Sequence, residues 1–270
     1  MCELLGMSSN EVATLNFSLH AFAEHGGESG PHIDGWGVAY YAGRDARLIK
    51  EAEAAAKSDW VRFIQDHSLT SRLVIAHIRK ATTGARTYSN TQPFVRELGG
   101  YAHVFAHNGH LAGIFDSPFF QPRRFQALGE TDSERAFCEL LERMSALWIE
   151  TGKVPPLEAR LATVAQFASE LRCFGPANFL YSDGDVLFAH GDRRTNRESK
   201  KIEAPGLVVL KRQCGRLQKS FSAKGLSIDG DSQLVSLVAS VPLTDEAWEP
   251  LEEGEIIILS GGSIIAKQKK

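Results

Sequence analysis

Short hydrophobic runs, many of them rich in β-branched residues, occur at both ends of the chain and predict strands there. In the first half these runs span residues 3–7, 35–41, 48–50, 73–79 and 101–106. In the second half they span residues 178–182, 186–190, 207–210, 234–239, 255–259 and 263–266. The Asp183-Gly184 pair between two of the later runs is a hairpin signal. A polar segment, Lys80–Gln92, separates two of the earlier runs and predicts a loop that Pro93 ends.

Hydrophobic residues at helical spacing fill the middle of the chain. A long helix is expected from Thr131, with one apolar face made by Phe137, Leu140, Leu141, Met144, Leu147 and Trp148. Thr131-Asp132-Ser133-Glu134 has the S/T-x-x-E pattern of a capping box, which supports that start. A second helix is expected over 157–171. Two further helices are predicted, a short one with Trp60, Phe63 and Ile64 on one face, and one after Thr14 through Leu15, Leu19 and Phe22.

The order of strands, two helices and further strands is typical of an α+β fold, with sheets in the middle and helices outside. No linker, internal repeat or change of composition divides the chain. The sequence therefore predicts one domain over residues 1–270.

Composition narrows the classes of protein without selecting one. The chain has 270 residues, of which 43% are hydrophobic and 23% charged, as in ordinary folded proteins. A net charge of −3 gives no general attraction to nucleic acid or acidic lipid. No apolar stretch approaches the ~20 residues that span a bilayer, and no signal-peptide pattern is seen. The four cysteines are far apart, so we expect a cytoplasmic protein with free thiols and no membrane partner.

Two patterns that suggest other chemistry are weak. His103, His107 and His110 have a spacing that suits metal binding on a helix, yet they fall in a predicted strand and turn with no further ligand nearby. We therefore expect no metal and no other cofactor. The basic run 193–201 lacks aromatic residues for base stacking, which favours a solvated loop over a nucleic-acid contact.

Cys2 is the first residue with candidate catalytic chemistry. If Met1 is removed, Cys2 carries a thiol and a free α-amine on one carbon. The thiolate is a strong nucleophile, and an α-amine with a pKa of about 7.7–8 can accept a proton near neutral pH. Such a site needs no histidine. The alternative is that Cys2 is simply the second residue of a chain that begins with a strand.

Arg79 stands where a predicted strand gives way to the polar loop. A guanidinium at such a position can bind a carboxylate with two parallel hydrogen bonds. The alternative is a surface arginine paired with a neighbouring acid. His77 alternates with Ile75 and Arg79, so we interpret it as a core histidine with its hydrogen bonds satisfied.

His107-Asn108-Gly109 follows another predicted strand. An asparagine amide and the next backbone N–H can direct two donors at one developing oxyanion. The alternative is a plain turn, since Asn-Gly is common in turns. Asp132, in the first turn of the long helix, could accept hydrogen bonds from a substrate ammonium. For Asn90–Phe94 and Asp34–Gly37, backbone shaping and direct site contact both remain open.

The order of these motifs is more specific than any one of them. Cys2, then His77-x-Arg79-x-Ala81-Thr82, then His107-Asn108-Gly109, then Thr131–Glu134 resembles the class II glutamine amidotransferases, a family of N-terminal-nucleophile hydrolases. The likeness includes Asn90-x-Gln92-Pro93-Phe94 and covers nearly the whole chain, which is similar to stand-alone bacterial members. It implies a four-layer αββα sandwich.

The resemblance also implies a reaction. Cys2 would attack the side-chain amide of glutamine while its own α-amine relays the proton. Asn108 and the Gly109 N–H would stabilise the oxyanion. A thioester would form, ammonia would leave, and water would release glutamate.

The same resemblance implies how the substrate is held. Arg79 would bind the α-carboxylate of glutamine, Asp132 the α-ammonium, and Thr82 would line the pocket. Two positions depart from the family pattern: Lys80 where an aromatic residue is frequent, and Thr83-Gly84 where His-Gly is frequent. Hydrolysis of a γ-glutamyl amide in a peptide or small metabolite, and a silent glutamine-sensing module, are the alternative functions. The ammonia would pass to a separate protein or to none.

Overall fold

The structure is a computed structural model of the 270-residue chain, and it describes residues 2–14, 32–67, 70–151, 153–196, 199–214, 220–223, 226–229 and 233–269. The helix predicted from Leu15, Leu19 and Phe22 lies outside these residues. No helix in the described part of the chain combines the length and the apolar character needed to cross a membrane.

The first of two large sheets has seven antiparallel strands in the order β15-β11-β14-β1-β4-β2-β3. Its strands are β1 (Glu3–Thr14), β2 (Trp36–Ala42), β3 (Asp45–Glu51), β4 (Thr70–Ile78), β11 (Val208–Cys214), β14 (Gln233–Ala239) and β15 (Glu249–Pro250). In the register of β1 and β4, Glu3 lies opposite Ile78. Cys2 therefore emerges from the sheet beside the loop that follows β4.

The second large sheet has six antiparallel strands in the order β17-β16-β8-β7-β6-β5. Its strands are β5 (Phe94–Leu98), β6 (Tyr101–Gly109), β7 (Ala177–Ser182), β8 (Leu187–Gly191), β16 (Glu255–Ser260) and β17 (Ser263–Gln268). Two small pairs join β9 (Arg194–Thr195) to β10 (Ile202–Glu203) and β12 (Ser220–Ala223) to β13 (Leu226–Asp229). Single 3-10 turns occur at Ala55–Lys57 and Ile114–Asp116.

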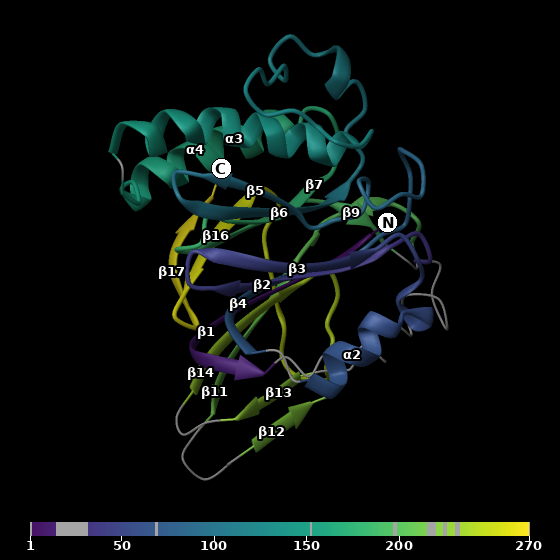
Figure 1. Ribbon diagram of the computed structural model, residues 1–270, viewed down its shortest axis with the longest axis vertical. Coiled ribbons are helices and arrows are strands. Elements are labelled where there is room, and N and C mark those ends of the chain that lie inside the picture. Colours follow the sequence, from purple (N-terminus) through teal and green to yellow (C-terminus); the bar gives the residue numbers. More distant parts are fainter. Residues whose placement is uncertain are drawn as a thin grey trace.

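The helices cover the outer faces of the two stacked sheets (Figure 1). Helices α3 (Asp132–Thr151) and α4 (Leu157–Leu171) lie over the six-stranded sheet, and α2 (Asp59–His67) lies against the seven-stranded sheet. One core fills the space between the sheets, through residues such as Leu4, Ile75 and Val104. Burial of apolar surface on both faces of each sheet explains this arrangement. The αββα sandwich that the family resemblance implies is confirmed.

The start of α3 follows the predicted cap in part. The Thr131 hydroxyl accepts the Glu134 N–H at 3.2 Å, as an N-cap should. The Glu134 carboxylate reaches further back than a capping box requires and accepts the N–H groups of Leu128 and Gly129, at 3.1 and 2.7 Å. Arg96 binds the same carboxylate at 2.6 Å. The segment before α3 is therefore fixed by one buried acid.

Two local predictions are wrong, and several short strands are not predicted. On α2 the buried residues are Val61 and Ile64, whereas Trp60 and Phe63 are 50% and 41% exposed, because the helix packs on the sheet through the former pair. The strands that match no predicted run are β5, β9, β10, β12, β13 and β15. Strand β6 continues through Gly109, because β7 pairs with it to that point, so Asn108-Gly109 is no turn. The long helix face and the second helix, Leu157–Leu171, are confirmed.

Candidate active site

Cys2 lies at the open end of β1, clipped to the loop after β4. Its Sγ accepts the backbone N–H of Lys80 at 3.3 Å and donates to the carbonyl of the same residue at 3.4 Å. The side chain is partly buried. Strand pairing of β1 on both sides makes this end of the chain rigid, and the two contacts with Lys80 fix the position of the sulfur.

The pKa of the Cys2 thiol reflects opposing neighbours. Burial is the largest effect and raises this pKa, whereas the Lys80 N–H and the positive charge of Arg79 lower it and the carboxylate of Asp132 raises it. A cation and an anion therefore lie within electrostatic range of one sulfur. This is the arrangement that a zwitterionic amino acid would need at a nucleophile.

Arg79 is buried, only 3% exposed, at the point where β4 ends. Its Nη1 donates to the Ala85 carbonyl at 3.0 Å, and its Nη2 donates to the carbonyls of Thr83 and Gly84 at 2.9 and 3.1 Å. Among the described residues it forms no ion pair within 4.0 Å, so the alternative of a surface arginine paired with an acid is wrong. Three of its five N–H groups shape the loop 83–85, which leaves two for a ligand.

Asp132 is the first residue of α3 and is 4% exposed. Its carboxylate accepts the N–H groups of Leu111 and Ser133 at 2.8 and 2.9 Å. The Nδ1 of His110 lies 3.5 Å from the same carboxylate. These contacts fix the position of the Asp132 carboxylate. Its oxygens have further lone pairs that can accept hydrogen bonds from a cation.

Asn108 lies on β6 and points into the space between the sheets. Its neighbour Ala106, two residues earlier, belongs to the core between the sheets, and alternate strand residues share a face. The Nδ2 of Asn108 donates to the Ser240 hydroxyl at 3.3 Å, and its Oδ1 is buried with no hydrogen-bond partner in the described chain. The Asn108 amide therefore faces the seven-stranded sheet, near the start of β1.

Gly109 follows on the same strand, and only glycine fits there. A Cβ at this position would lie 1.7 Å from the Pro176 carbonyl oxygen. The sixth candidate, Thr82, is exposed on the loop after β4, and among the described residues its side chain makes no hydrogen bond. Its predicted place in a substrate pocket stays a prediction.

Several polar residues of the flanking segments shape the backbone of the site. Both atoms of the Gln92 side-chain amide bind the backbone of His107, with the His107 N–H donating at 2.6 Å and Gln92 Nε2 at 3.3 Å. Asn90 joins the loop to the start of α3, because it donates to Ala85 O at 2.9 Å and accepts the Glu130 N–H at 2.7 Å. These bonds favour the backbone-shaping interpretation of this motif.

Asp34 lies close to the candidate cation. Its carboxylate accepts the Ala81 N–H at 2.9 Å, and its negative charge acts to raise the pKa of Arg79, which burial lowers. No charged role is predicted for Asp34 from the sequence. Asp34 is therefore a second acid, besides Asp132, near Arg79.

Two residues that the sequence analysis missed support Asn108. Ser240, which follows β14, accepts from the Asn108 side chain and from the backbone N–H of Leu4. Asn178, opposite Asn108 in the β6–β7 register, donates to the Asn108 carbonyl at 3.1 Å. Neither lies in a motif, and nothing in the local sequence marks them.

His77 lies between the sheets, opposite Leu4 on one side and Gly37 on the other. It is fully buried, as predicted. Its two ring nitrogens have no hydrogen-bond partner in the described part of the chain, so the prediction that its hydrogen bonds are satisfied is wrong. Burial, together with the charge of Arg79, lowers its pKa to about 3, and the nearby His107 carbonyl offsets little of that shift. His77 is therefore neutral at physiological pH.

The histidines considered for a metal have other partners. His103 Nδ1 contacts the Tyr181 hydroxyl at 2.7 Å, and His107 Nδ1 contacts the Ser133 hydroxyl at 2.9 Å. In the ranges that the structure describes, no three His, Cys, Asp or Glu side chains form a cluster that could hold a metal ion.

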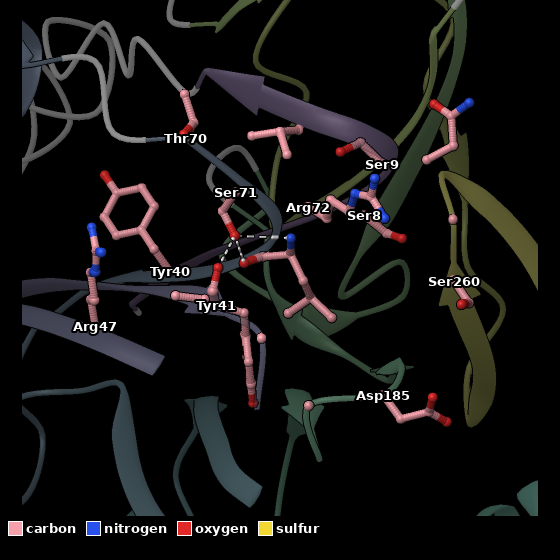
Figure 2. Close-up of a pocket in the computed structure, with 17 residues that line it drawn as sticks. Ser8, Ser9, Tyr40, Tyr41, Arg47, Thr70, Ser71, Arg72, Asp185 and Ser260 are labelled. Atoms are coloured by element: carbon pink, nitrogen blue, oxygen red, sulfur yellow. Dashed lines mark hydrogen bonds between the residues drawn. The ribbon is translucent and has the colours of Figure 1, made fainter. Parts of the chain in front are cut away.

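A surface hollow of about 690 Å³ lies away from these residues (Figure 2). Its lining includes Ser8, Tyr40 and Arg47, toward the end of β1 that is distant from Cys2. The Ser71 hydroxyl in its wall is already used by the backbone of Tyr41 and Leu73. None of the six candidate residues lines this hollow.

The sequence of this chain is similar to those of known proteins. A family model described as glutamine amidotransferases class-II matches residues 1–270. The chain is 37% identical over 261 residues to "Putative glutamine amidotransferase YafJ" of Escherichia coli (strain K12), covering 94% of this chain and 96% of that protein.

Solved structures agree with this likeness. A predicted glutamine amidotransferase from Pseudomonas aeruginosa has 32% identity and a TM-score of 0.67, covering 98% of this chain and all of that one. A glutamine phosphoribosylpyrophosphate amidotransferase from B. subtilis, 17% identical, shares the fold with a TM-score of 0.61. The match covers 99% of this chain and 49% of that one.

Proposed function

Because this chain belongs to the class II glutamine amidotransferase family, we propose that it hydrolyses the side-chain amide of glutamine through a thioester on Cys2. The observation that carries this proposal is a buried cation and a buried anion beside the same loop as the Cys2 sulfur. Arg79 precedes Lys80, whose backbone N–H binds the sulfur at 3.3 Å. Asp132 lies 3.5 Å from His110, which in turn lies 3.4 Å from the Thr83 hydroxyl of that loop. The two charges match the α-carboxylate and α-ammonium of an amino acid. Membership of this family indicates that the protein is an enzyme. The proposed roles of the site residues are argued below.

In the proposed mechanism, removal of Met1 frees the α-amine of Cys2. The amine takes the thiol proton, and the sulfur attacks the amide carbon of glutamine. Collapse of the tetrahedral intermediate breaks the carbon–nitrogen bond, and the protonated amine gives its proton to the leaving ammonia. Water then attacks the thioester, again with the amine as base, and releases glutamate and the free thiol.

Asn108 and Gly109 are the proposed oxyanion donors. The tetrahedral intermediate places negative charge on the former amide oxygen, and two fixed N–H donors in a water-poor site stabilise that charge strongly. Asn108 is fully buried and its side chain faces the layer between the sheets. The absence of a side chain on Gly109 allows the close approach of the Pro176 backbone that shapes this end of the strand.

Arg79 and Asp132 are the proposed binding residues for the ends of the substrate. Arg79 has N–H groups beyond those that hold the loop, and Asp132 is held by backbone donors that leave acceptor sites. Thr82 is proposed to line the pocket from the exposed side of the loop. The Lys80 side chain, where family members often carry an aromatic residue, would change the shape of that side.

A γ-glutamyl amide in a peptide or metabolite is the second candidate substrate. The loop next to Arg79 is exposed at Ala81, Thr82 and 85–88, so a leaving group larger than ammonia has access from solvent. The same nucleophile and oxyanion donors would act. Glutamine remains the first candidate because the family's members carry its name.

The fate of the ammonia belongs to this proposal as well. We propose that the chain is one amidotransferase domain and that, if the ammonia is used, a separate protein accepts it.

The proposed reaction also suggests a compartment. It requires the Cys2 thiol to be reduced, so it suits the cytoplasm, where thiols stay reduced.

The direct test is release of glutamate and ammonia from glutamine by the purified protein, beside a panel of γ-glutamyl amides. Intact mass before and after treatment with an electrophilic glutamine analogue should show the loss of one methionine and then one adduct. No turnover of any of these substrates, or full activity with Met1 retained, would contradict the proposal.

A further inference from the structure

Ser240 connects the strand of the nucleophile to the side chain of Asn108. It follows β14 and is 4% exposed. Its hydroxyl accepts the Leu4 N–H at 3.0 Å and the Asn108 Nδ2–H at 3.3 Å, and its own N–H donates to the Leu4 carbonyl at 3.1 Å. These three segments are distant in sequence and meet at one buried hydroxyl.

We propose that Ser240 is a positioning residue that orients the Asn108 amide toward the reacting carbonyl oxygen. The two hydrogens of an amide NH₂ lie in one plane, so a partner for one of them fixes the direction of the other. The side-chain torsion of asparagine is otherwise broad. The inference rests on the proposed function, because it gives the second hydrogen of Asn108 the oxyanion as its acceptor.

The position of the Ser240 hydroxyl is itself fixed by backbone contacts. The backbone N–H is bound to Leu4, and the carbonyl of Ser240 accepts a hydrogen bond from Arg194. The backbone of Asn108 is held separately, since Asn178 Nδ2 donates to its carbonyl. Asn108 is therefore restrained at two points, and Ser240 is the described residue that restrains its side-chain nitrogen.

A serine that only held β1 to β14 would make the same contacts with Leu4. Ser236 provides a control for the general cost of losing a buried serine hydroxyl from this part of the sheet. It lies on β14, the strand that Ser240 follows, is fully buried, and donates its hydroxyl hydrogen to the Gly262 carbonyl at 2.8 Å. Loss of its hydroxyl removes one buried hydrogen bond, in which the serine is the donor, and alters no contact of Asn108.

The test compares glutamine hydrolysis by the unaltered protein, Ser240→Ala, Ser236→Ala, Asn108→Ala and the double variant Ser240→Ala with Asn108→Ala. Loss of an oxyanion donor lowers kcat by about 10²–10³, and misdirecting it should lower kcat by about 10- to 100-fold. KM should change less than about threefold, since the groups that bind the ends of the substrate are unaltered. In the Asn108→Ala background, Ser240→Ala should have almost no further effect on kcat.

Two results would overturn the role of Ser240 and leave the proposed function standing. One is a kcat for Ser240→Ala within twofold of Ser236→Ala, and the other is an equal loss of kcat with and without Asn108. If Ser240→Ala does not fold, Ser240→Cys keeps the volume with a weaker acceptor and should show the same selective fall in kcat. An unaltered protein that hydrolyses neither glutamine nor a γ-glutamyl amide would instead remove the proposed function, and this inference with it.

Discussion

The sulfur of Cys2 lies 3.3 Å from the backbone nitrogen of Lys80, the residue that follows Arg79. The start of one strand and the end of its neighbour are thereby held together at the nucleophile. Hydrogen bonding from an N–H favours the thiolate, and it partly offsets the effect of burial on the thiol pKa. Because the contact uses the backbone, the lysine side chain is free to differ from the aromatic residue that relatives often carry.

Replacing Cys2 should abolish turnover. Cys2→Ala removes the thiol that is proposed to form the thioester, and glutamate release should fall by at least about 10⁴-fold. The control is Cys173→Ala, because that thiol is exposed and contacts only the Ser169 carbonyl among its described neighbours. Glutamate formation under saturating glutamine is the measurement. Comparable activity of the two variants would exclude a nucleophilic role for Cys2.

Arg79→Lys should weaken recognition of the α-carboxylate. A lysine keeps the charge but lacks the planar pair of donors, so KM for glutamine should rise about tenfold or more. The same variant should lose much less with glutaminamide, which has no α-carboxylate to bind. The measurement is kcat/KM for both substrates.

The comparison of substrates separates binding from loop structure, because Arg79 also donates to the carbonyls of Thr83, Gly84 and Ala85. Arg72→Lys is the matched substitution on β4, the strand that ends just before Arg79, since Arg72 forms an exposed pair with Glu11. It should leave both substrates unchanged. Equal losses for glutamine and glutaminamide in Arg79→Lys would assign Arg79 to the loop alone.

Asp132→Asn should make the Cys2 thiol more acidic. The negative charge of Asp132 raises the thiol pKa, so removing that charge lowers it. The rate of Cys2 alkylation, followed by mass spectrometry across pH, should reach half its maximum at a lower pH than in the unaltered protein. Cys138 will not interfere, because burial raises its pKa to about 11. A shift to higher pH would contradict the proposed proximity.

Mild acid should destabilise the protein through its buried histidines. Burial lowers the pKa of His77 and His103 to about 3 and that of His190 to about 4. In the unfolded chain these groups titrate near 6.5, so below that pH the unfolded state binds more protons. Stability is therefore complete above about pH 6.5 and falls as the pH drops toward 4, by about 1.4 kcal/mol per pH unit for each group.

His77→Leu isolates one of these groups. It replaces an unpartnered buried imidazole by an apolar side chain, so it should change stability little at pH 7. The slope of unfolding free energy against pH between 6 and 4.5, measured by urea titration, should fall by up to about 1.4 kcal/mol per pH unit. His67→Leu, at an exposed site on α2, is the comparison. An equal change of slope in both variants would show that burial of His77 is not the cause.

Much of the architecture follows from local patterns. The apolar face from Phe137 to Trp148 and the cap at Thr131 specify α3 because a helix satisfies its backbone within its own segment. Patterning fails where packing decides between faces, as on α2, where Trp60 and Phe63 are aromatic and yet exposed. It also fails at Asn108-Gly109, because pairing with a distant strand overrides the turn preference of that dipeptide.

The sequence by itself determined the chemistry of the candidates: a thiol at Cys2, a guanidinium at the end of a strand, an Asn-Gly pair and an acid at a helix start. Only the tertiary structure decided which of them meet, and it added Ser240 and Asn178, which carry no motif. The reason is the range of the contacts. Ser240 is 236 residues from Leu4 and 132 from Asn108. Its bond to Leu4 depends on how distant strands pair within one sheet, and its bond to Asn108 depends on how the two sheets stack.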